Sequence, residues 1–157
     1  MTARRKPGER GLTLVELIVA FTILSLLTTM AVPLARYRVR RDKERELLFA
    51  LRQIRKAIDD YKDAAITGKI EQKLGTDGYP ESLEQLVEGV KLLQSAEGKK
   101  VKFLRRIPKD PMTNSFDWGK HSIQDDPTSQ SWGGQNVFDV FTKSTERARD
   151  GTLYSDW

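Results

Sequence analysis

A single acidic side chain, Glu16, interrupts an otherwise uncharged apolar segment that runs from Leu12 to Leu34. Placing a charged side chain in lipid costs about 2.5–3.5 kcal/mol at the centre of a membrane helix, and less toward its ends. Such residues usually pair with a group of opposite charge, and they often mark a functional site. Glu16 therefore predicts either a functional ion pair or, as the plainer alternative, an acid tolerated near the membrane interface.

The segment that carries Glu16 is long enough to cross a bilayer. As a helix rising 1.5 Å per residue, residues 12–34 span about 34 Å. They exceed the apolar core of an ordinary secretory signal peptide, and no small-residue cleavage site follows them. Basic residues flank both ends of the segment, so charge alone does not fix its orientation. They are Arg4, Arg5, Lys6 and Arg10 before it, and Arg36, Arg38, Arg40, Arg41, Lys43 and Arg45 after it.

The sequence GLTLVE at residues 11–16, after a short basic leader, resembles the type III signal of type IV pilins and type II secretion pseudopilins. Leu12 departs from the phenylalanine that is commoner after the glycine. The resemblance implies that a prepilin peptidase cuts between Gly11 and Leu12 and that Leu12 is then N-methylated. It also implies that Glu16 pairs with the terminal amine of a neighbouring subunit. The N-terminus would be cytoplasmic, with a single pass through the bacterial inner membrane and a periplasmic C-terminal domain.

A second feature is the absence of glycine from residue 12 to residue 67, with good helix formers throughout residues 36–67. This predicts one helix of about 55 residues, about 80 Å long. Apolar residues spaced 4, 3, 4, 3 and 4 apart form a stripe along its second half. The stripe comprises Leu47, Leu51, Ile54, Ile58, Tyr61 and Ala65. A coiled coil could cover it, but residues 76–157 are the better candidate. Pro33 predicts either a tolerated kink or a hinge.

The sequence predicts an α+β, type IV pilin-like fold, in which the long N-terminal helix packs against a small antiparallel β-sheet. Ser82 and Gln85 form a capping-box pattern that predicts a short helix over residues 82–87. Alternating side chains over Asn136–Thr142 predict a strand. The expected regions are a leader at 1–11, a transmembrane or filament-core helix at 12–34, its amphipathic continuation at 35–68, and a periplasmic globular part at 69–157.

The globular part is similar in three short stretches to the major, G-type pseudopilin of type II secretion. These stretches are residues 78–80, 107–111 and 137–140. G-type pseudopilins bind calcium in their C-terminal loop, which implies a candidate calcium site at Ser144, Asp150 and Asp156. Three nearby cations and a mismatch to the family's loop sequence favour the alternative, a simple turn at Asp150 and a surface acid at Asp156. No other cofactor is expected.

The composition argues against catalysis and nucleic-acid binding. The chain has no cysteine, and its one histidine, His121, is expected in a surface turn. Phosphate-binding glycine loops and zinc-binding helix motifs are absent. The net charge is +5, of which the leader carries a large share. A mature chain with so little excess charge is not a dedicated nucleic-acid binder.

The leading interpretation is a structural pseudopilin of a type II secretion or type IV pilus-like filament that supports protein secretion, in the periplasm or at the cell surface. Its expected partners are copies of itself, other pseudopilins, the prepilin peptidase and the inner-membrane assembly platform. Two alternatives remain open. One is a minor type IV pilin or DNA-uptake pseudopilin. The other, of a different class, is a membrane-anchored periplasmic enzyme or binding module.

Overall fold

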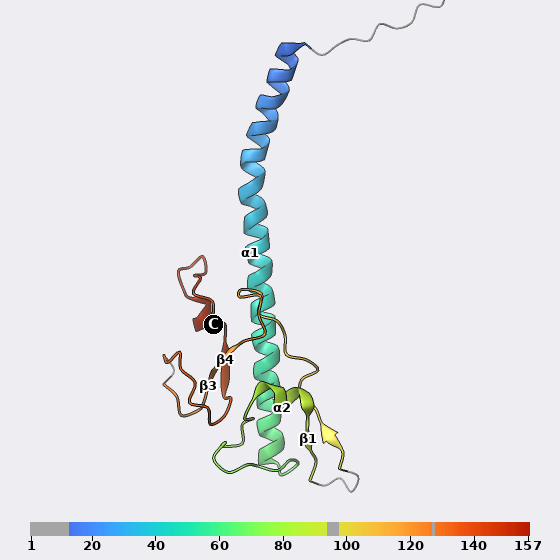
Figure 1. Ribbon diagram of the computed structural model, residues 1–157, viewed down its shortest axis with the longest axis vertical. Coiled ribbons are helices and arrows are strands. Elements are labelled where there is room, and N and C mark those ends of the chain that lie inside the picture. The colour runs from blue at the N-terminus through green and yellow to red at the C-terminus, as the bar shows by residue number, and fades with distance from the viewer. Residues whose placement is uncertain (1–12, 94–97, 127) are drawn as a thin grey trace, which may run out of the picture. The chain divides into compact units, whose positions relative to one another are not determined.

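The computed structural model describes residues 13–93, 98–126 and 128–157. Its longest element is helix α1, Leu14–Ile66 (Figure 1). After it come α2 (Leu83–Glu88), the strands β1 (Val90–Lys91), β2 (Lys100–Val101), β3 (Gly119–His121) and β4 (Asp139–Phe141), and the 3-10 helix η1 (Tyr154–Asp156). The chain divides into two compact units, of which the first ends at Arg41 and the second begins at Asp42. A long N-terminal helix followed by small antiparallel β-structure confirms the predicted α+β, type IV pilin-like fold.

The first half of α1 remains helical through Pro33. Proline has no N–H to donate to the carbonyl of Thr29, four residues earlier. The threonine hydroxyls nearby donate to carbonyls earlier in the helix and not to that of Thr29. Thr28 Oγ1 donates to the carbonyl of Leu24 at 2.8 Å, and Thr29 Oγ1 donates to that of Ser25 at 2.9 Å. The predicted role of Pro33 as a kink or a hinge stays a prediction.

The second half of α1 buries the predicted stripe. Its six members, from Leu47 to Ala65, all belong to the hydrophobic core of the second unit. Gly68, which has a φ of +66°, lies just beyond the end of the helix. In this left-handed conformation its N–H donates to the carbonyl of Ala65 at 3.1 Å. The helix therefore ends where the glycine-free stretch ends, because glycine adopts this conformation without steric cost.

Helix α2 begins where the capping pattern places it. Ser82 Oγ accepts a hydrogen bond from the N–H of Gln85 at 3.4 Å, and Gln85 Oε1 accepts one from the N–H of Glu81 at 2.9 Å. One donor left unpaired at the helix start, the N–H of Gln85, is thereby satisfied, together with the N–H just before the cap. Leu83 and Leu86 are buried, so this short helix contributes directly to the core.

The β-structure consists of two separate antiparallel pairs, β1 with β2 and β3 with β4. In the second pair Lys120 lies opposite Val140. The strand predicted over Asn136–Thr142 is correct only for its centre, since β4 covers three residues. The residues before it are held by loops instead. The N–H of Val137 donates to the carbonyl of Pro80 at 2.7 Å, and Asn136 Oδ1 accepts from the N–H of Ile123 at 3.1 Å.

The core of the second unit gathers around the stripe on α1. Trp118, Val140 and Tyr154 are almost fully buried there, and each comes from a different part of the chain. Tyr154 also donates a hydrogen bond through its hydroxyl to Glu44 Oε1 at 2.7 Å. Residues near the end of the described chain thus pack against the beginning of the second unit. Burial of large apolar side chains supplies most of the stability of such a small fold.

Candidate functional site

Glu16 lies in the first turn of α1 and is exposed. Its backbone N–H donates to Thr13 Oγ1 at 3.2 Å, so Thr13 caps the start of the helix. Its carboxylate forms no ion pair with another residue that the structure describes. A carboxylate in the first turn of a helix is stabilised by the helix dipole, by about 0.3–1 kcal/mol. This stabilisation is smaller than the cost of placing a charge in lipid, so in lipid the helix dipole alone would not offset the charge of Glu16.

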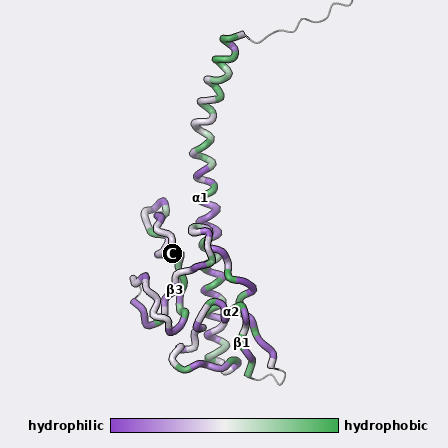
Figure 2. The backbone as a smooth tube through the Cα atoms, in the orientation of Figure 1, coloured by the Kyte–Doolittle hydropathy of each residue, from purple (hydrophilic) through white to green (hydrophobic). Residues whose placement is uncertain are grey.

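The first half of α1 presents apolar side chains on all its sides. Leu14, Phe21 and Leu24 are among the many large hydrophobic residues that stay exposed there. Figure 2 shows the hydrophobic colouring along this half and the hydrophilic colouring of the stretch that follows it. This helix is long and apolar enough to cross a membrane, judged by length and composition. An apolar surface of this extent requires lipid or other helices to cover it.

Gly11 and Leu12, the predicted cleavage pair, lie outside the described residues. The structure describes the helix that follows them, with the acid, the cap and the apolar surface in place. Six basic residues over positions 36–45 come directly after the apolar half. The order of elements is therefore a capped helix start with one acid, an apolar span of membrane length, and a basic stretch.

The candidate calcium residues are each occupied by contacts close in sequence. Asp150 Oδ1 accepts hydrogen bonds from Thr152 Oγ1 at 2.7 Å and from the N–H of Thr152 at 3.0 Å. These two bonds lower the pKa of Asp150 below its ordinary value. Ser144 Oγ accepts from the N–H of Glu146, and Asp156 Oδ1 accepts from the hydroxyl of Ser155. Among the described residues, no group of three or more acidic or histidine side chains is placed to hold a metal ion.

His121 is not in a surface turn, so that expectation is wrong. It is the last residue of β3, and its ring stacks on Phe141 with 4.6 Å between centroids. Its Nε2 hydrogen-bonds the carbonyl of Ser129. Gly119 leaves room for the phenyl ring of Phe141 on which His121 stacks, because a Cβ at residue 119 would collide with that ring. His121 thus has a packing role that sequence spacing did not reveal.

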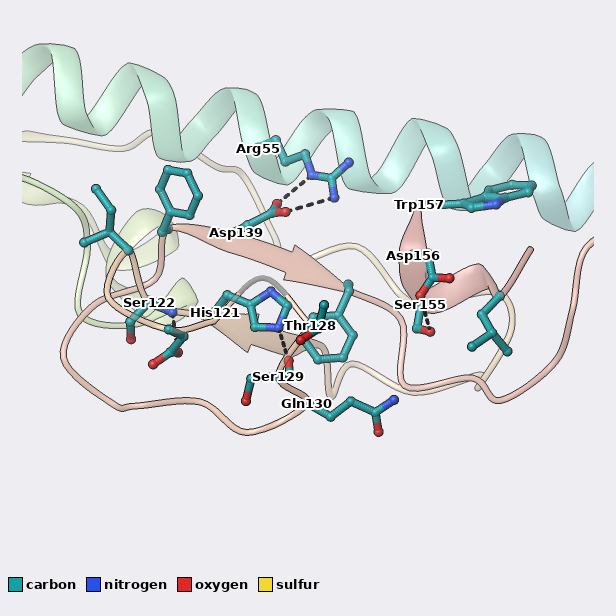
Figure 3. A pocket seen from close by; sticks show the side chains of 15 residues that line it. Arg55, His121, Ser122, Thr128, Ser129, Gln130, Asp139, Ser155, Asp156 and Trp157 are labelled. Atoms are coloured by element: carbon teal, nitrogen blue, oxygen red, sulfur yellow. Dashed lines mark hydrogen bonds and ion pairs between the residues drawn. The ribbon is translucent and has the colours of Figure 1, made fainter.

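A groove of about 610 Å³ lies between the β3–β4 pair and the C-terminal residues, and Figure 3 shows its lining. Arg55 Nε donates to Asp139 Oδ1 at 2.7 Å, and Arg55 Nη2 donates to the carbonyl of Val140 at 3.2 Å. The guanidinium and the carboxylate therefore neutralise each other. On another side of the groove, Asp125 Oδ2 accepts from the N–H groups of Ser122 and Gly133, and these bonds lower the pKa of Asp125.

One buried acid joins two distant parts of the chain. Asp110 is fully buried, and Thr142 Oγ1 donates to its Oδ2 at 2.5 Å. It also accepts from the N–H of Met112 and the hydroxyl of Thr113. These contacts tie the loop around residue 110 to the residue that follows β4. This attachment of residue 110 to Thr142 had no signal in the sequence.

Comparison with known families identifies the N-terminal part of the chain. Residues 6–32 match the family described as "Prokaryotic N-terminal methylation motif", the signal of type IV pilins and pseudopilins. The matched range contains the second half of the basic leader, Gly11, Glu16 and most of the apolar half of α1. No curated protein and no solved structure matches this chain significantly. The chain therefore carries a pilin-type methylation signal, on a fold of the type IV pilin-like α+β class.

Proposed function

We propose that this protein is a structural subunit, a pseudopilin, of a type II secretion or type IV pilus-like filament assembled from the bacterial inner membrane. The observation that carries the proposal is the methylation signal at residues 6–32 joined to a helix whose apolar half is exposed on all sides. In the proposed cycle, residues 1–11 are removed and Leu12 becomes the methylated terminus. The apolar half first lies in lipid and then packs with its counterparts in the filament.

Glu16 has a definite task in this proposal. The new amine of Leu12 on an adjacent subunit carries the positive charge that the exposed carboxylate needs. An ion pair formed in a low-dielectric surrounding is stronger than one in water. Assembly is then favoured over the isolated subunit in lipid, because only assembly brings the two charges together. Head-to-tail contacts of this kind build a filament when the rotation between subunits does not close into a ring.

The remaining parts of the proposal follow the resemblance to G-type pseudopilins. The globular unit is periplasmic, and the partners are other pseudopilins, the peptidase and an assembly platform. The self-contained contacts of Asp150 and Ser144 support a C-terminal loop that keeps its conformation without calcium. Enzymatic activity is no part of the proposed role.

The proposal is tested first at the leader. In cells that contain a prepilin peptidase, the mature protein should begin at an N-methylated Leu12, as determined by mass spectrometry. Gly11→Glu should block this step, whereas Gly8→Glu, a matched change within the leader, should leave it intact. A mature chain that still begins at Met1 would rule out the proposed role.

A further inference from the structure

The outer side of α1 in the second unit carries charges of opposite sign at its two ends. Arg45 and Arg52 are exposed near its beginning, while Asp59, Asp60 and Asp63 are exposed near its end. Arg45 makes only a long contact with Asp42, at 3.9 Å. Lys56 pairs with Asp60 at 2.9 Å, but Asp63 forms no ion pair with a residue that the structure describes. Asp63 is therefore available to pair with a cation from another molecule.

A groove of about 500 Å³ lies beside this acidic end. Its lining combines Asp60 and Asp63 with the apolar side chains of Ile66, Leu92 and Phe103. Lys69 also lies at the groove and offsets one of the two acids. Ile66 is 67% exposed, although it is a large apolar side chain. A groove of this composition fits an apolar side chain that has cations beside it.

The same chain offers such a segment at residues 45–52. Phe49 is 64% exposed and Leu48 is 40% exposed, and both lie between Arg45 and Arg52. The buried stripe occupies the other side of the helix, so the globular unit leaves these side chains uncovered. An exposed phenyl ring with arginines beside it complements, in polarity and charge, an apolar groove in which Asp63 has no ion pair with a described residue.

The spacing along α1 gives a definite register. Leu48 and Ile66 are 18 residues apart, as are Arg45 and Asp63. Eighteen residues make five turns of helix and about 27 Å, so each pair lies on one side of α1. A second, parallel copy that is displaced by about 27 Å and turned about its own axis, so that these sides of the two helices face each other, would bring its Arg45 to the level of Asp63 and its Leu48 to the level of Ile66. Phe49 would then be level with the groove.

From this arrangement we infer that the groove beside Asp63 receives residues 45–52 of a second copy of this chain. Phe49 of the second copy enters among Ile66, Leu92 and Phe103, and its Arg45 pairs with Asp63. The inference rests on the proposed function, because copies inserted in one membrane are parallel. It adds a second ion pair to that of Glu16, at the other end of the subunit and outside lipid. This pair fixes the stagger between copies.

Cysteine pairs test the register directly, because the chain contains no cysteine. The full-length Leu48→Cys/Ile66→Cys variant should form disulfide-linked multimers in filaments after mild oxidation. The two sites within one chain are about 27 Å apart, far beyond the reach of a disulfide. Leu48→Cys/Leu74→Cys is the matched control, since Leu74 is 98% exposed and equally accessible to oxidant. Multimers in the control at the same yield, or none in the test variant, would overturn the register.

A charge exchange tests the pairing. Arg45→Glu and Asp63→Lys should each lower the yield of sedimentable filaments about tenfold, and the double variant should restore most of it. Absence of rescue would overturn the pair. Unmodified chains that are processed and form filaments, with neither cross-link nor rescue, would refute this inference and leave the proposed function standing. Unmodified chains that are processed but never form filaments would refute both.

Discussion

The two halves of α1 share one helical conformation but differ in what covers them. In the first half, large apolar side chains such as Phe21 and Leu24 are exposed on every side. In the second half, a single stripe that includes Leu47 and Ile54 is buried by the rest of the chain. Helix propensity accounts for both halves equally well. The difference lies in hydrophobic burial, which the chain completes by itself in one half and leaves to lipid or other copies in the other.

This contrast predicts that substitutions in the two halves affect different properties, folding stability in one and assembly in the other. Substitutions on the stripe should act on the stability of the second unit, since their partners belong to the same chain. Substitutions in the apolar half should leave that stability unchanged and act on insertion or filament formation. Each experiment below compares the two halves, and the expected effects run from the largest to the smallest.

Ile54→Ala should produce the largest loss of folding stability, because Ile54 is fully buried in the core of the second unit. Truncating such a side chain destabilises a fold by about 2–5 kcal/mol. Urea unfolding of the full-length protein in detergent, followed by the fluorescence of buried Trp118, measures the loss. Leu24→Ala is the matched control and should change the free energy of unfolding by less than about 0.5 kcal/mol. Equal effects of the two changes would abolish the distinction between the halves.

Glu16→Ala should act on assembly and not on folding. The free energy of unfolding should stay the same, while the filament yield should fall about tenfold. A tenfold change corresponds to loss of an ion pair worth about 1.4 kcal/mol. Membrane insertion should remain, as removal of a charge makes the helix more apolar. Sedimentation of filaments and carbonate extraction of membranes measure the two properties. Thr22→Ala, a polar change on the same half, serves as control. Wild-type filament yield from Glu16→Ala would remove the proposed role of the acid.

A smaller effect concerns the loop that Asp125 organises. The pKa of Asp125 is lowered in the folded state by the N–H groups of Ser122 and Gly133. A lowered pKa contributes stability that is fully present above the ordinary carboxyl value near pH 4, and this stability is lost as the pH falls through the folded value. Asp125→Asn should therefore reduce the melting temperature slightly at pH 7 and weaken its fall below pH 4. An unchanged pH profile would contradict this assignment.

Calcium should not change the stability of the protein. Asp150 already accepts two hydrogen bonds from Thr152, and Arg147 Nη1 donates to the carbonyl of Gly151 at 2.8 Å, so a guanidinium occupies one oxygen of this loop. The melting temperature of the full-length protein in detergent should be the same in millimolar calcium and in chelator, with magnesium as the control cation. A rise with calcium alone would restore Ser144, Asp150 and Asp156 as a metal site.

The sequence predicted those features that depend on local periodicity or on a short signal. The stripe on α1 and the cap at Ser82 follow from residue spacing, and the structure confirms both. The stacking of His121 on Phe141 and the bond from Thr142 to Asp110 were not foreseen. These contacts join residues from distant parts of the chain, and their geometry depends on the packing of β3 and β4, which no local pattern encodes.

The hydroxyls of Thr22, Thr28 and Thr29 each donate to a carbonyl of their own helix. As a result, these three hydroxyls have no proton left to donate to a neighbouring helix, and contacts of another helix with this half of α1 are mostly apolar. Apolar contacts of this kind permit sliding and twisting at little cost. In the proposed filament, helices packed in this way would let the pitch change under load, while the inferred ion pairs at the periphery would keep the subunits in register.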